Sequence, residues 1–338
     1  MPADRRLIEA RLKLHQLAIG SWAAQALFAA NGLGVFELLE AGPRSAEQVA
    51  SELGTDEEAT ARLLGALVAI DLLERGDGAR FRNGPAASAY LTTAGSESMA
   101  TWVSLIDRWN ESFAHLASSI RSGDPAEPPE DHLGGTREYT RRFIHGMHDY
   151  AVGPGRELAT HLDLTSRRRL LDVGGGPGTY SLMLAERNPE LACVVFDLPE
   201  VVAIADDVIA RHGLTDRVVT AAGDYHTDQL PDGFDVALIS NVLHQEDRAA
   251  CLEILAKTRS ALAAGGIVVV QAMFLNETGD GPMWPALHNL LMLLVYRGGK
   301  AYSASETSAM LVESGFEEPQ LNRMSPFNAE SFIVARRG

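Results

Sequence analysis

The spacing of apolar residues changes between the first and the second half of the chain. In the first half, apolar residues recur three and four positions apart, which is typical of helices that bury one face. The first such stripe contains Leu12, Leu14, Leu17, Ala18, Trp22, Leu27 and Phe28. In the second half, short apolar runs alternate with helical patterns. The sequence therefore predicts an all-helical region followed by an α/β region.

The helical region contains the order of elements found in a winged helix. Ser45 begins one helix with a capping-box-like pattern, and the stretch Thr55-Asp-Glu-Glu starts another helix after Gly54. Residues 72–81 then place two extended runs around a Gly-Asp-Gly turn, which predicts a hairpin. The second helix, predicted over residues 59–72, carries Arg62 as its one basic residue. We therefore expect this segment to be a scaffold and not a DNA reader.

The α/β region predicts a doubly wound, mostly parallel sheet. Its apolar runs lie at residues 169–173, 192–196, 217–221, 235–240 and 266–272. Helical patterns between them predict helices on both faces of a parallel sheet. In such a Rossmann-like fold, ligands bind at the carboxyl ends of the strands.

The first predicted strand of this sheet ends in a glycine-rich turn. Residues 170–178 read Leu-Leu-Asp-Val-Gly-Gly-Gly-Pro-Gly. Because glycine tolerates positive φ and has no Cβ, the backbone at Gly174, Gly175 and Gly176 can turn sharply and approach a ligand closely. The spacing does not fit the Gly-x-Gly-x-x-Gly pattern of dinucleotide folds. A nucleotide-like cofactor is still indicated.

Acidic residues end the next two predicted strands. Asp197 follows 23 residues after Gly174, where a carboxylate can accept both hydroxyls of a ribose. Asp224 ends the third strand, where a small polar group can meet an adenine edge. Helix capping by loop acids is the alternative explanation. The glycine turn upstream favours cofactor binding.

Four motifs, in this order and spacing, carry a resemblance to a known family. They are Leu171–Gly178, Phe196-Asp197-Leu198-Pro199, Gly223-Asp224-Tyr225 and Val242-Leu243-His244. Over nearly its whole length the chain resembles the class I S-adenosylmethionine-dependent O-methyltransferases of the caffeate and acetylserotonin type, in their bacterial natural-product tailoring branch. The resemblance implies that S-adenosylmethionine is the cofactor and S-adenosylhomocysteine the product. The cofactor-binding residues that it implies are Asp172, Gly174, Gly175, Gly176, Asp197, Leu198, Asp224, Tyr225 and Ser240.

The resemblance also implies a domain organisation and a substrate pocket. It gives a winged-helix-like dimerisation domain over residues 1–95, a helical connector over 96–160 and a cofactor-binding domain over 161–338. The leading helices would be exchanged within a homodimer, although the apolar stripe could instead pack on its own chain. A predicted helix over residues 99–121 would help line the pocket, with an aromatic side that is otherwise explained as core. The implied substrate-binding residues are Trp109, Phe143, Met147, His288, Asn289, Met292 and Tyr296.

His244 is the predicted general base. It lies four residues beyond Ser240, at the carboxyl end of the fourth predicted strand. A neutral imidazole can accept a proton near pH 7, and the family's histidine at this position has that role. The alternative is that the histidine caps the following helix.

The chain departs from the family around this histidine. In the plant enzymes an aspartate and two glutamates flank the base, and the matching positions here are Gln245, Gln271 and Ala301. Gln271 can still orient the ring. We expect Asp247, as the nearest spare carboxylate, to replace the lost counter-charge, with Glu246 and Glu277 as further candidates.

The loss of these carboxylates leaves other functions open. One is methylation at the carbon of an enol, a 2-oxo acid or an electron-rich heteroaromatic ring. His244, His288 and either Asp247 or Glu277 could then hold a metal, but their spacing is not a recognised metal signature, so no metal site is predicted. Another is a relative that binds the cofactor without transferring its methyl group. A gene-regulatory winged helix is the remaining alternative.

Composition narrows the choice of partners. The 338 residues carry a net charge of −16, which opposes binding to nucleic acid. No apolar run approaches the ~20 residues of a membrane span, and no signal-peptide core is present, so a soluble cytoplasmic protein is expected. Cys193 and Cys251 form no CxxC pattern. We therefore predict a homodimeric methyltransferase of secondary metabolism, acting on a hydroxyl of a small aromatic acceptor.

Overall fold

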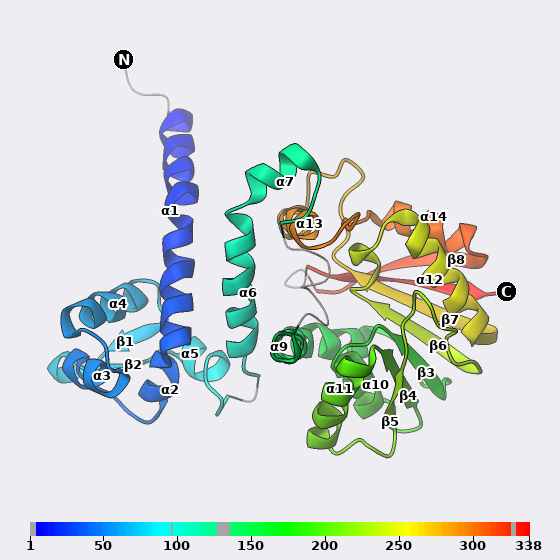
Figure 1. Ribbon diagram of the computed structural model, residues 1–338, viewed down its shortest axis with the longest axis horizontal. Coiled ribbons are helices and arrows are strands. Elements are labelled where there is room, and N and C mark those ends of the chain that lie inside the picture. The colour runs from blue at the N-terminus through cyan, green and yellow to red at the C-terminus, as the bar shows by residue number, and fades with distance from the viewer. Residues whose placement is uncertain (1–4, 96, 127–135, 326–328) are drawn as a thin grey trace. The chain divides into compact units, whose positions relative to one another are not determined.

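The computed structural model describes residues 5–95, 97–126, 136–325 and 329–338. The chain forms two compact units, Met1–Arg108 and Trp109–Gly338, shown with their elements labelled in Figure 1. The boundary falls within helix α6 (Ala100–Phe113), inside the connector predicted for residues 96–160. Among the described residues, no helix has both the length and the apolar character needed to cross a membrane.

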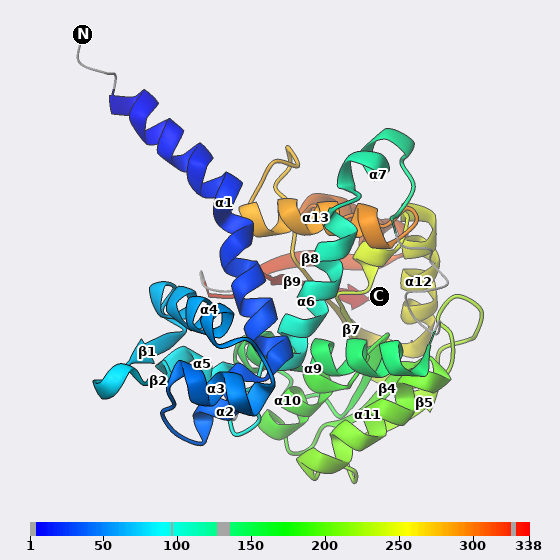
Figure 2. The same ribbon diagram turned by 60° about the vertical axis from the view of Figure 1, so that its left-hand side comes forward.

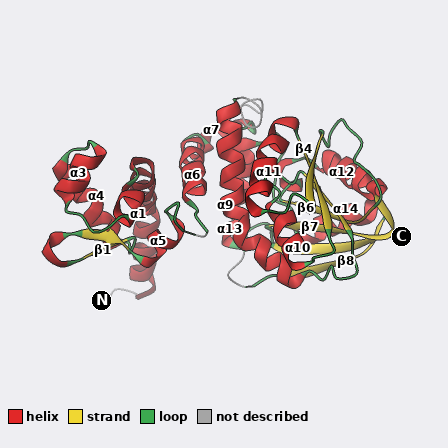
Figure 3. Cartoon of the chain, turned by 90° about the horizontal axis from the view of Figure 1, so that it is seen from below, coloured by secondary structure: helices red, strands yellow, loops and turns green. Residues whose placement is uncertain are grey.

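The first unit is built from helices and one short hairpin. Its elements are α1 (Arg5–Leu33), α2 (Val35–Glu40), α3 (Ala46–Leu53), α4 (Glu57–Ala69), β1 (Leu73–Arg75), a 3-10 turn (Asp77–Ala79), β2 (Phe81–Asn83) and α5 (Pro85–Tyr90). Ser45 caps α3 in a capping box with Gln48, and Asp56 caps α4. Figure 3 shows the hairpin strand β1 in yellow close to α3 and α4. The predicted order of helix, helix and hairpin is confirmed.

Helix α1 buries only part of its length. Phe28 and Ala30, near its end, belong to the core of the unit. The apolar side chains of its earlier turns are exposed, including Leu7, Ile8, Leu12, Leu14, Leu17 and Trp22. Figure 2 shows these turns extending away from α2–α5. The first part of the predicted apolar stripe, from Leu12 to Trp22, therefore does not pack on the described part of its own unit, whereas Phe28 at its end does.

The second unit contains a seven-stranded sheet in the order β5-β4-β3-β6-β7-β9-β8. Its strands are β3 (Arg169–Val173), β4 (Ala192–Asp197), β5 (Val218–Ala222), β6 (Phe234–Ser240), β7 (Leu262–Ala272), β8 (Phe316–Arg323) and β9 (Ser331–Arg337). Strands β3 to β7 pair in parallel, whereas β9 runs antiparallel to both β7 and β8. The prediction of a doubly wound, mostly parallel sheet is confirmed.

Helices cover both faces of this sheet. On one face α9 (Arg137–His161), α10 (Thr179–Arg187) and α11 (Pro199–His212) enclose an apolar core that includes Leu158, Leu182 and Val208. On the other face α12 (Arg248–Ala261) and α14 (Ala304–Glu313) enclose a second core that includes Ile254 and Leu311. Figure 1 shows the two groups of helices on opposite sides of the strands.

The remaining helices are α7 (Leu116–Ser122) and α13 (Met283–Val295). The single helix predicted over residues 99–121 is wrong, because α6 ends at Phe113 and α7 begins at Leu116. His115 precedes α7 without a capping hydrogen bond from its side chain.

Candidate active site

The glycine turn after β3 has the geometry expected from its sequence. Gly174 and Gly176 have φ values of 64° and 54°, in the left-handed region that favours glycine. A Cβ on Gly175 would lie 2.6 Å from Cγ of Asp172 and 2.9 Å from Cγ1 of Val195. A Cβ on Gly176 would meet nothing within 4 Å. The turn is therefore tightly packed below Gly175 and open at Gly176.

Asp197, at the end of the neighbouring strand β4, is hydrogen-bonded to the backbone of this turn. Its Oδ2 accepts a hydrogen bond from the backbone N–H of Gly176 at 2.7 Å, and its Oδ1 accepts one from the N–H of Leu198 at 2.7 Å. Burial raises the pKa of Asp197 to about 6, and the two backbone hydrogen bonds oppose that rise. The structure thus brings Gly176, Asp197 and Leu198 together, as the predicted cofactor site requires.

Asp172 lies beneath the turn and is almost fully buried. Its Oδ2 accepts a hydrogen bond from Oγ of Ser181 at 2.7 Å, whereas its buried Oδ1 has no hydrogen-bond partner in the described structure. Burial raises the pKa of Asp172 to about 7, and the nearby charge of Asp197 adds to the rise. Buried oxygens without a partner are rare, so this one is a candidate for binding a ligand donor.

Asp224 and Tyr225 belong to a loop that is held firmly after β5. Oδ1 of Asp224 accepts from the N–H of His226 at 2.8 Å. The ammonium group of Lys257 donates to the carbonyl oxygens of Tyr225, His226 and Asp228, at 2.8, 2.6 and 3.0 Å. These bonds place the half-buried Tyr225 ring beside the glycine turn, 3.4 Å from the position of a Cβ on Gly174.

The residues around the turn fit a ligand with a ribose and an amino-acid end. The open side at Gly176 admits close approach, and Asp197 lies where the ribose hydroxyls of such a ligand bind in this fold. The unpartnered Oδ1 of Asp172 can accept from a donor such as an ammonium group. S-adenosylmethionine has both parts. Oγ of Ser240, at the end of β6, donates to Oε1 of Gln271 at 3.4 Å.

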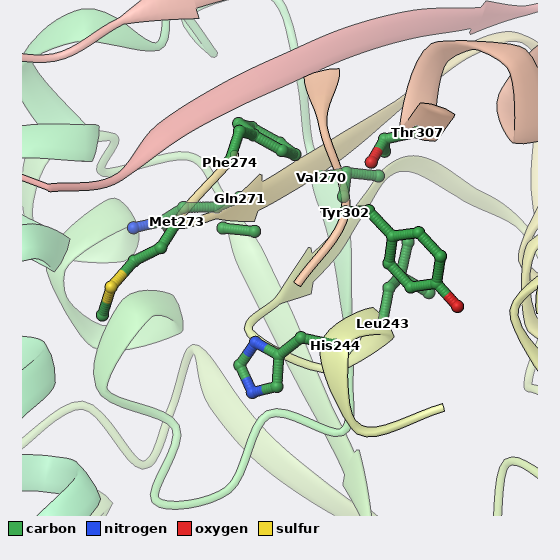
Figure 4. Close-up of a pocket in the computed structure, with 9 residues that line it drawn as sticks. Leu243, His244, Val270, Gln271, Met273, Phe274, Tyr302 and Thr307 are labelled. Carbon is green, nitrogen blue, oxygen red and sulfur yellow. The ribbon is translucent and has the colours of Figure 1, made fainter. Parts of the chain in front are cut away.

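His244 lies in a 3-10 turn (Leu243–Gln245) beyond the carboxyl end of β6. It is half-buried and lines a pocket together with Leu243, Val270, Gln271, Ala272, Met273, Phe274, Tyr302 and Thr307 (Figure 4). The hydroxyl of Tyr302 donates to the carbonyl oxygen of Glu246 at 2.8 Å and so helps to fix the turn that holds His244. Burial, and then the nearby His288, hold the pKa of His244 well below its ordinary value of 6.5. The imidazole is neutral at pH 7 and able to accept a proton.

His288 on α13 lies next to His244. The two ring centroids are 4.7 Å apart and the ring planes meet at 76°. Burial lowers the pKa of His288 to about 4, and its Nδ1 is buried without a hydrogen-bond partner in the described structure. The structure therefore joins the predicted base to one of the predicted pocket residues.

The three carboxylates expected to replace the lost counter-charge have other partners. Asp247 is exposed and caps α12, because its Oδ1 accepts from the N–H of Ala250 at 2.9 Å. Glu246 accepts from the Tyr225 hydroxyl at 3.0 Å, and Glu277 accepts from the Ser305 hydroxyl. Among the described contacts, no hydrogen bond joins any of the three to His244. The structure explains Asp247 as a helix cap and does not bring it to the base.

The other predicted pocket residues fall into two groups. Trp109 and Phe143 are buried, and their rings make an edge contact with centroids 6.3 Å apart; Met147 is half-buried on the same helix as Phe143. On α13, Met292 is buried, and Oδ1 of Asn289 accepts from the N–H of Ala301 at 2.8 Å. Tyr296 is half-buried and directly follows α13. Asn289 therefore fastens α13 to the following loop.

One buried acid at this site was not predicted from the sequence. Glu330 precedes β9, is 1% exposed, and accepts from the amide of Gln271 and from Nδ2 of Asn241, the latter at 2.9 Å. Asn241 has a φ of 56°, which is unusual for a residue with a side chain. The one signal in the sequence is an acid placed directly before an apolar run, which is too common to identify a site.

The chain matches two family models along most of its length. Residues 131–317 match an O-methyltransferase domain, and residues 15–93 match an O-methyltransferase dimerisation domain. Two curated relatives come from Streptomyces. A 3-hydroxy-5-methyl-1-naphthoate 3-O-methyltransferase of Streptomyces sahachiroi is 33% identical over 95% of this chain and 94% of its own length. The N,N-dimethyltransferase OxyT of Streptomyces rimosus is 31% identical over 95% of each chain.

Among solved structures, human N-acetylserotonin methyltransferase in complex with S-adenosylmethionine is similar over 100% of this chain and 99% of its own. Its TM-score is 0.90 and its sequence identity is 28%. The two halves of the chain thus agree with the two domains of one family in sequence and in fold. The chain belongs to the O-methyltransferase family and is an S-adenosylmethionine-dependent methyltransferase.

Proposed function

We propose that the enzyme methylates a hydroxyl oxygen of a small aromatic acceptor, with His244 as the general base. The observation that carries this proposal is the position of a neutral imidazole in a pocket directly beyond β6. The same segment adjoins the glycine turn, since Cγ2 of Val242 lies 2.8 Å from the position of a Cβ on Gly174. A base and a cofactor site on neighbouring residues can bring an acceptor and a methyl donor together.

The chemistry needs one proton transfer and one in-line approach. When bound, S-adenosylmethionine supplies an electrophilic methyl group on a positively charged sulfur. His244 takes the proton of the acceptor hydroxyl, and the acceptor oxygen then forms a bond to the methyl carbon while the carbon–sulfur bond breaks and leaves its electron pair on sulfur. The products are the methyl ether, S-adenosylhomocysteine and an imidazolium that returns its proton to solvent.

An aromatic acceptor suits the side chains near the base. Met273 and Phe274 line the pocket with His244, and a thioether or a ring packs well against a flat aromatic molecule. The naphthoate substrate named for the Streptomyces sahachiroi relative is of this class. We keep the predicted pocket residues as proposals on this basis: Trp109, Phe143, Met147, His288, Asn289, Met292 and Tyr296.

An amine is the second candidate acceptor, because OxyT is named as an N,N-dimethyltransferase. A neutral His244 can take a proton from an ammonium group as well as from a hydroxyl.

Methylation at carbon has no support from the two named relatives. Transfer without a metal is part of the proposal, and within the described residues no three His, Cys, Asp or Glu side chains form a metal site.

We further propose a homodimer that forms through the N-terminal helices. The match to a dimerisation domain and the exposed apolar side chains of α1 support it. Binding to nucleic acid is not part of the proposal, given the net charge of −16. A cytoplasmic location stays a prediction from the sequence, which cell fractionation would test.

The test of the proposed function is product analysis with S-adenosylmethionine that carries a ¹³C-labelled methyl group. The purified enzyme is incubated with a panel of phenols, naphthols, arylamines and 2-oxo acids, with and without chelator. Label on oxygen, unaffected by chelator and lost in His244→Ala, is the expected result. Label on nitrogen would favour the second candidate, and label on carbon or a loss of turnover with chelator would overturn the proposal.

A further inference from the structure

Glu330 has an unusual concentration of hydrogen-bond donors. Oε1 accepts from the Tyr150 hydroxyl at 2.8 Å and from the Asn241 amide at 2.9 Å. Oε2 accepts from the Tyr180 hydroxyl at 3.2 Å and from the Gln271 amide. Burial raises the pKa of Glu330, whereas the four hydrogen bonds favour the ionised form. These donors stabilise a negative charge on the buried Glu330 carboxylate.

Three of these donors lie near the two halves of the proposed reaction, and the fourth, Tyr150, comes from α9. Tyr180 lies in the first turn of α10, directly after the glycine turn. Asn241 is followed by Val242, which contacts Gly174, and then by Leu243 and His244. Gln271 lines the His244 pocket. Glu330 is therefore hydrogen-bonded to residues next to the glycine turn and to a residue that lines the same pocket as the base.

Gln271 occupies one of the positions where the sequence comparison leads us to expect a carboxylate. The side-chain amide of Gln271 donates to Glu330. The carboxylate is therefore on the hydrogen-bonded partner of residue 271 and not on residue 271 itself. The Gln271 Oε1 is consequently turned toward Oγ of Ser240.

We propose that Glu330 is a positioning residue whose buried negative charge favours the positively charged sulfur of the cofactor over the neutral thioether of the product. The inference rests on the proposed function, since it needs a cofactor at the glycine turn and an acceptor at His244. During transfer the positive charge passes from sulfur to the imidazole of His244, and Glu330 is hydrogen-bonded to Tyr180 after the glycine turn and to Gln271 in the His244 pocket. It supplies the counter-charge that Gln245, Gln271 and Ala301 do not.

The charge makes a measurable difference between two ligands of the same shape. S-adenosylmethionine and S-adenosylhomocysteine share the adenosine and amino-acid ends and differ by one methyl group and one positive charge. In a protein interior with an effective dielectric constant near 20, a charge at a distance of roughly 10 Å changes the relative affinity of such a pair by a factor of about ten. Loss of hydrogen bonds alone would weaken the binding of both ligands to a similar extent.

The test measures the dissociation constants of both ligands by calorimetry at pH 8, in wild type and in Glu330→Gln. We expect the ratio of Kd for S-adenosylhomocysteine to Kd for S-adenosylmethionine to fall about tenfold in the variant. The matched control is Glu313→Gln, which removes an exposed carboxylate that pairs with Arg248 and should keep the wild-type ratio. An unchanged ratio in Glu330→Gln would overturn the inference while leaving the proposed function intact.

A variant that exchanges the side chains of Glu330 and Gln271 distinguishes the effect of the negative charge from the effect of altered packing. Glu330→Gln combined with Gln271→Glu keeps a hydrogen bond between the two side chains and moves the carboxylate to position 271. We expect this variant to return the ratio to within about threefold of wild type, and a ratio as low as that of the single variant would contradict the inference.

Two variants that keep a carboxylate at position 330 test the inference if Glu330→Gln does not fold. Glu330→Asp and Tyr150→Phe should hold the ratio within about twofold of wild type, and a tenfold fall in either would overturn the inference. Wild-type protein that binds neither ligand would overturn the proposed function together with it.

Discussion

The imidazole of His288 meets the imidazole of His244 edge to face, with the ring centroids 4.7 Å apart. Burial holds the pKa of both rings below the ordinary value, to about 4 for His288. Two neutral rings in contact give the site one base that can take a proton and a second polar group next to it. Adding a proton to either ring places a positive charge beside its neighbour.

The burial of His288 predicts a loss of stability on acidification. The unfolded chain protonates His288 near pH 6.5 and the folded protein near pH 4, so the unfolded state binds more protons between these values. The free energy of unfolding should therefore fall as the pH falls from about 6.5 to about 4. In His288→Gln this contribution is absent. Urea unfolding at pH 7 and pH 4.5 should show a smaller loss in the variant, and an equal loss would contradict the assigned pKa.

Replacement of the predicted base should reduce turnover and spare cofactor binding. For His244→Ala we expect kcat to fall by about 10² to 10⁴-fold, the usual contribution of a general base, with the Kd for S-adenosylmethionine within about threefold of wild type. The matched control is His161→Ala, at an exposed histidine in the last turn of α9. A fall in kcat of less than tenfold would remove His244 from the role of base.

Two glycines of the turn should respond differently to alanine. A methyl group at Gly175 would collide with Asp172 and Val195, so Gly175→Ala should destabilise the fold by about 1 to 3 kcal/mol. Gly176→Ala meets no atom and costs only its left-handed backbone, about 1 kcal/mol, yet its methyl group would occupy the open side of the turn. Thermal unfolding measures the loss of stability expected for Gly175→Ala. Calorimetry measures the loss of affinity for S-adenosylmethionine expected for Gly176→Ala. Normal cofactor affinity in a folded Gly176→Ala would show that the ligand does not approach this glycine.

Lys257 should matter for cofactor affinity although it lies behind the loop that it holds. Its three hydrogen bonds to the carbonyls of Tyr225, His226 and Asp228 fix the segment after Asp224. We expect Lys257→Met to raise the Kd for S-adenosylmethionine by about tenfold, because the loop must then be ordered by the ligand. Lys300→Met, which breaks an exposed pair with Glu306, is the control. Equal affinities in the two variants would show that the loop is ordered without Lys257.

The exposed stripe of α1 predicts a change of oligomeric state. Leu14 and Leu17 are 68% and 69% exposed, and a glutamate at both positions would place two charges in an apolar interface. Sedimentation velocity should show a dimer for wild type and a monomer for Leu14→Glu/Leu17→Glu. Val312→Glu changes an exposed apolar residue of α14 and should leave the dimer intact. A dimeric double variant would place the interface elsewhere.

The parallel part of the sheet was predictable because its strands are short apolar runs that end in recognisable turns. The last two strands were not predicted. Strand β8 exposes Glu317 and Glu318 and contains Pro319, so it has no clear alternation, and proline is tolerated there because β8 is an edge strand. The Asp247 cap could have been predicted, since an aspartate before a helical pattern is a common N-cap.

The network around Glu330 could not be predicted from local patterns. Its partners Gln271 and Tyr150 lie 59 and 180 positions away in the chain. Only the antiparallel entry of β9 beside β7 brings this acid to the pocket, and that pairing follows from the whole sheet and not from the residues near Glu330.

The place of β9 between β7 and β8 also affects the order in which the sheet can form. Strand β8 is made before β9, yet within the sheet β9 is its hydrogen-bonded neighbour. Strand β8 therefore has no strand to pair with in the sheet until β9 has paired with β7. The edge that carries Gln271 is thus completed late, and an inserted loop or a slow codon between residues 316 and 331 would lengthen the time for which this edge is open to aggregation.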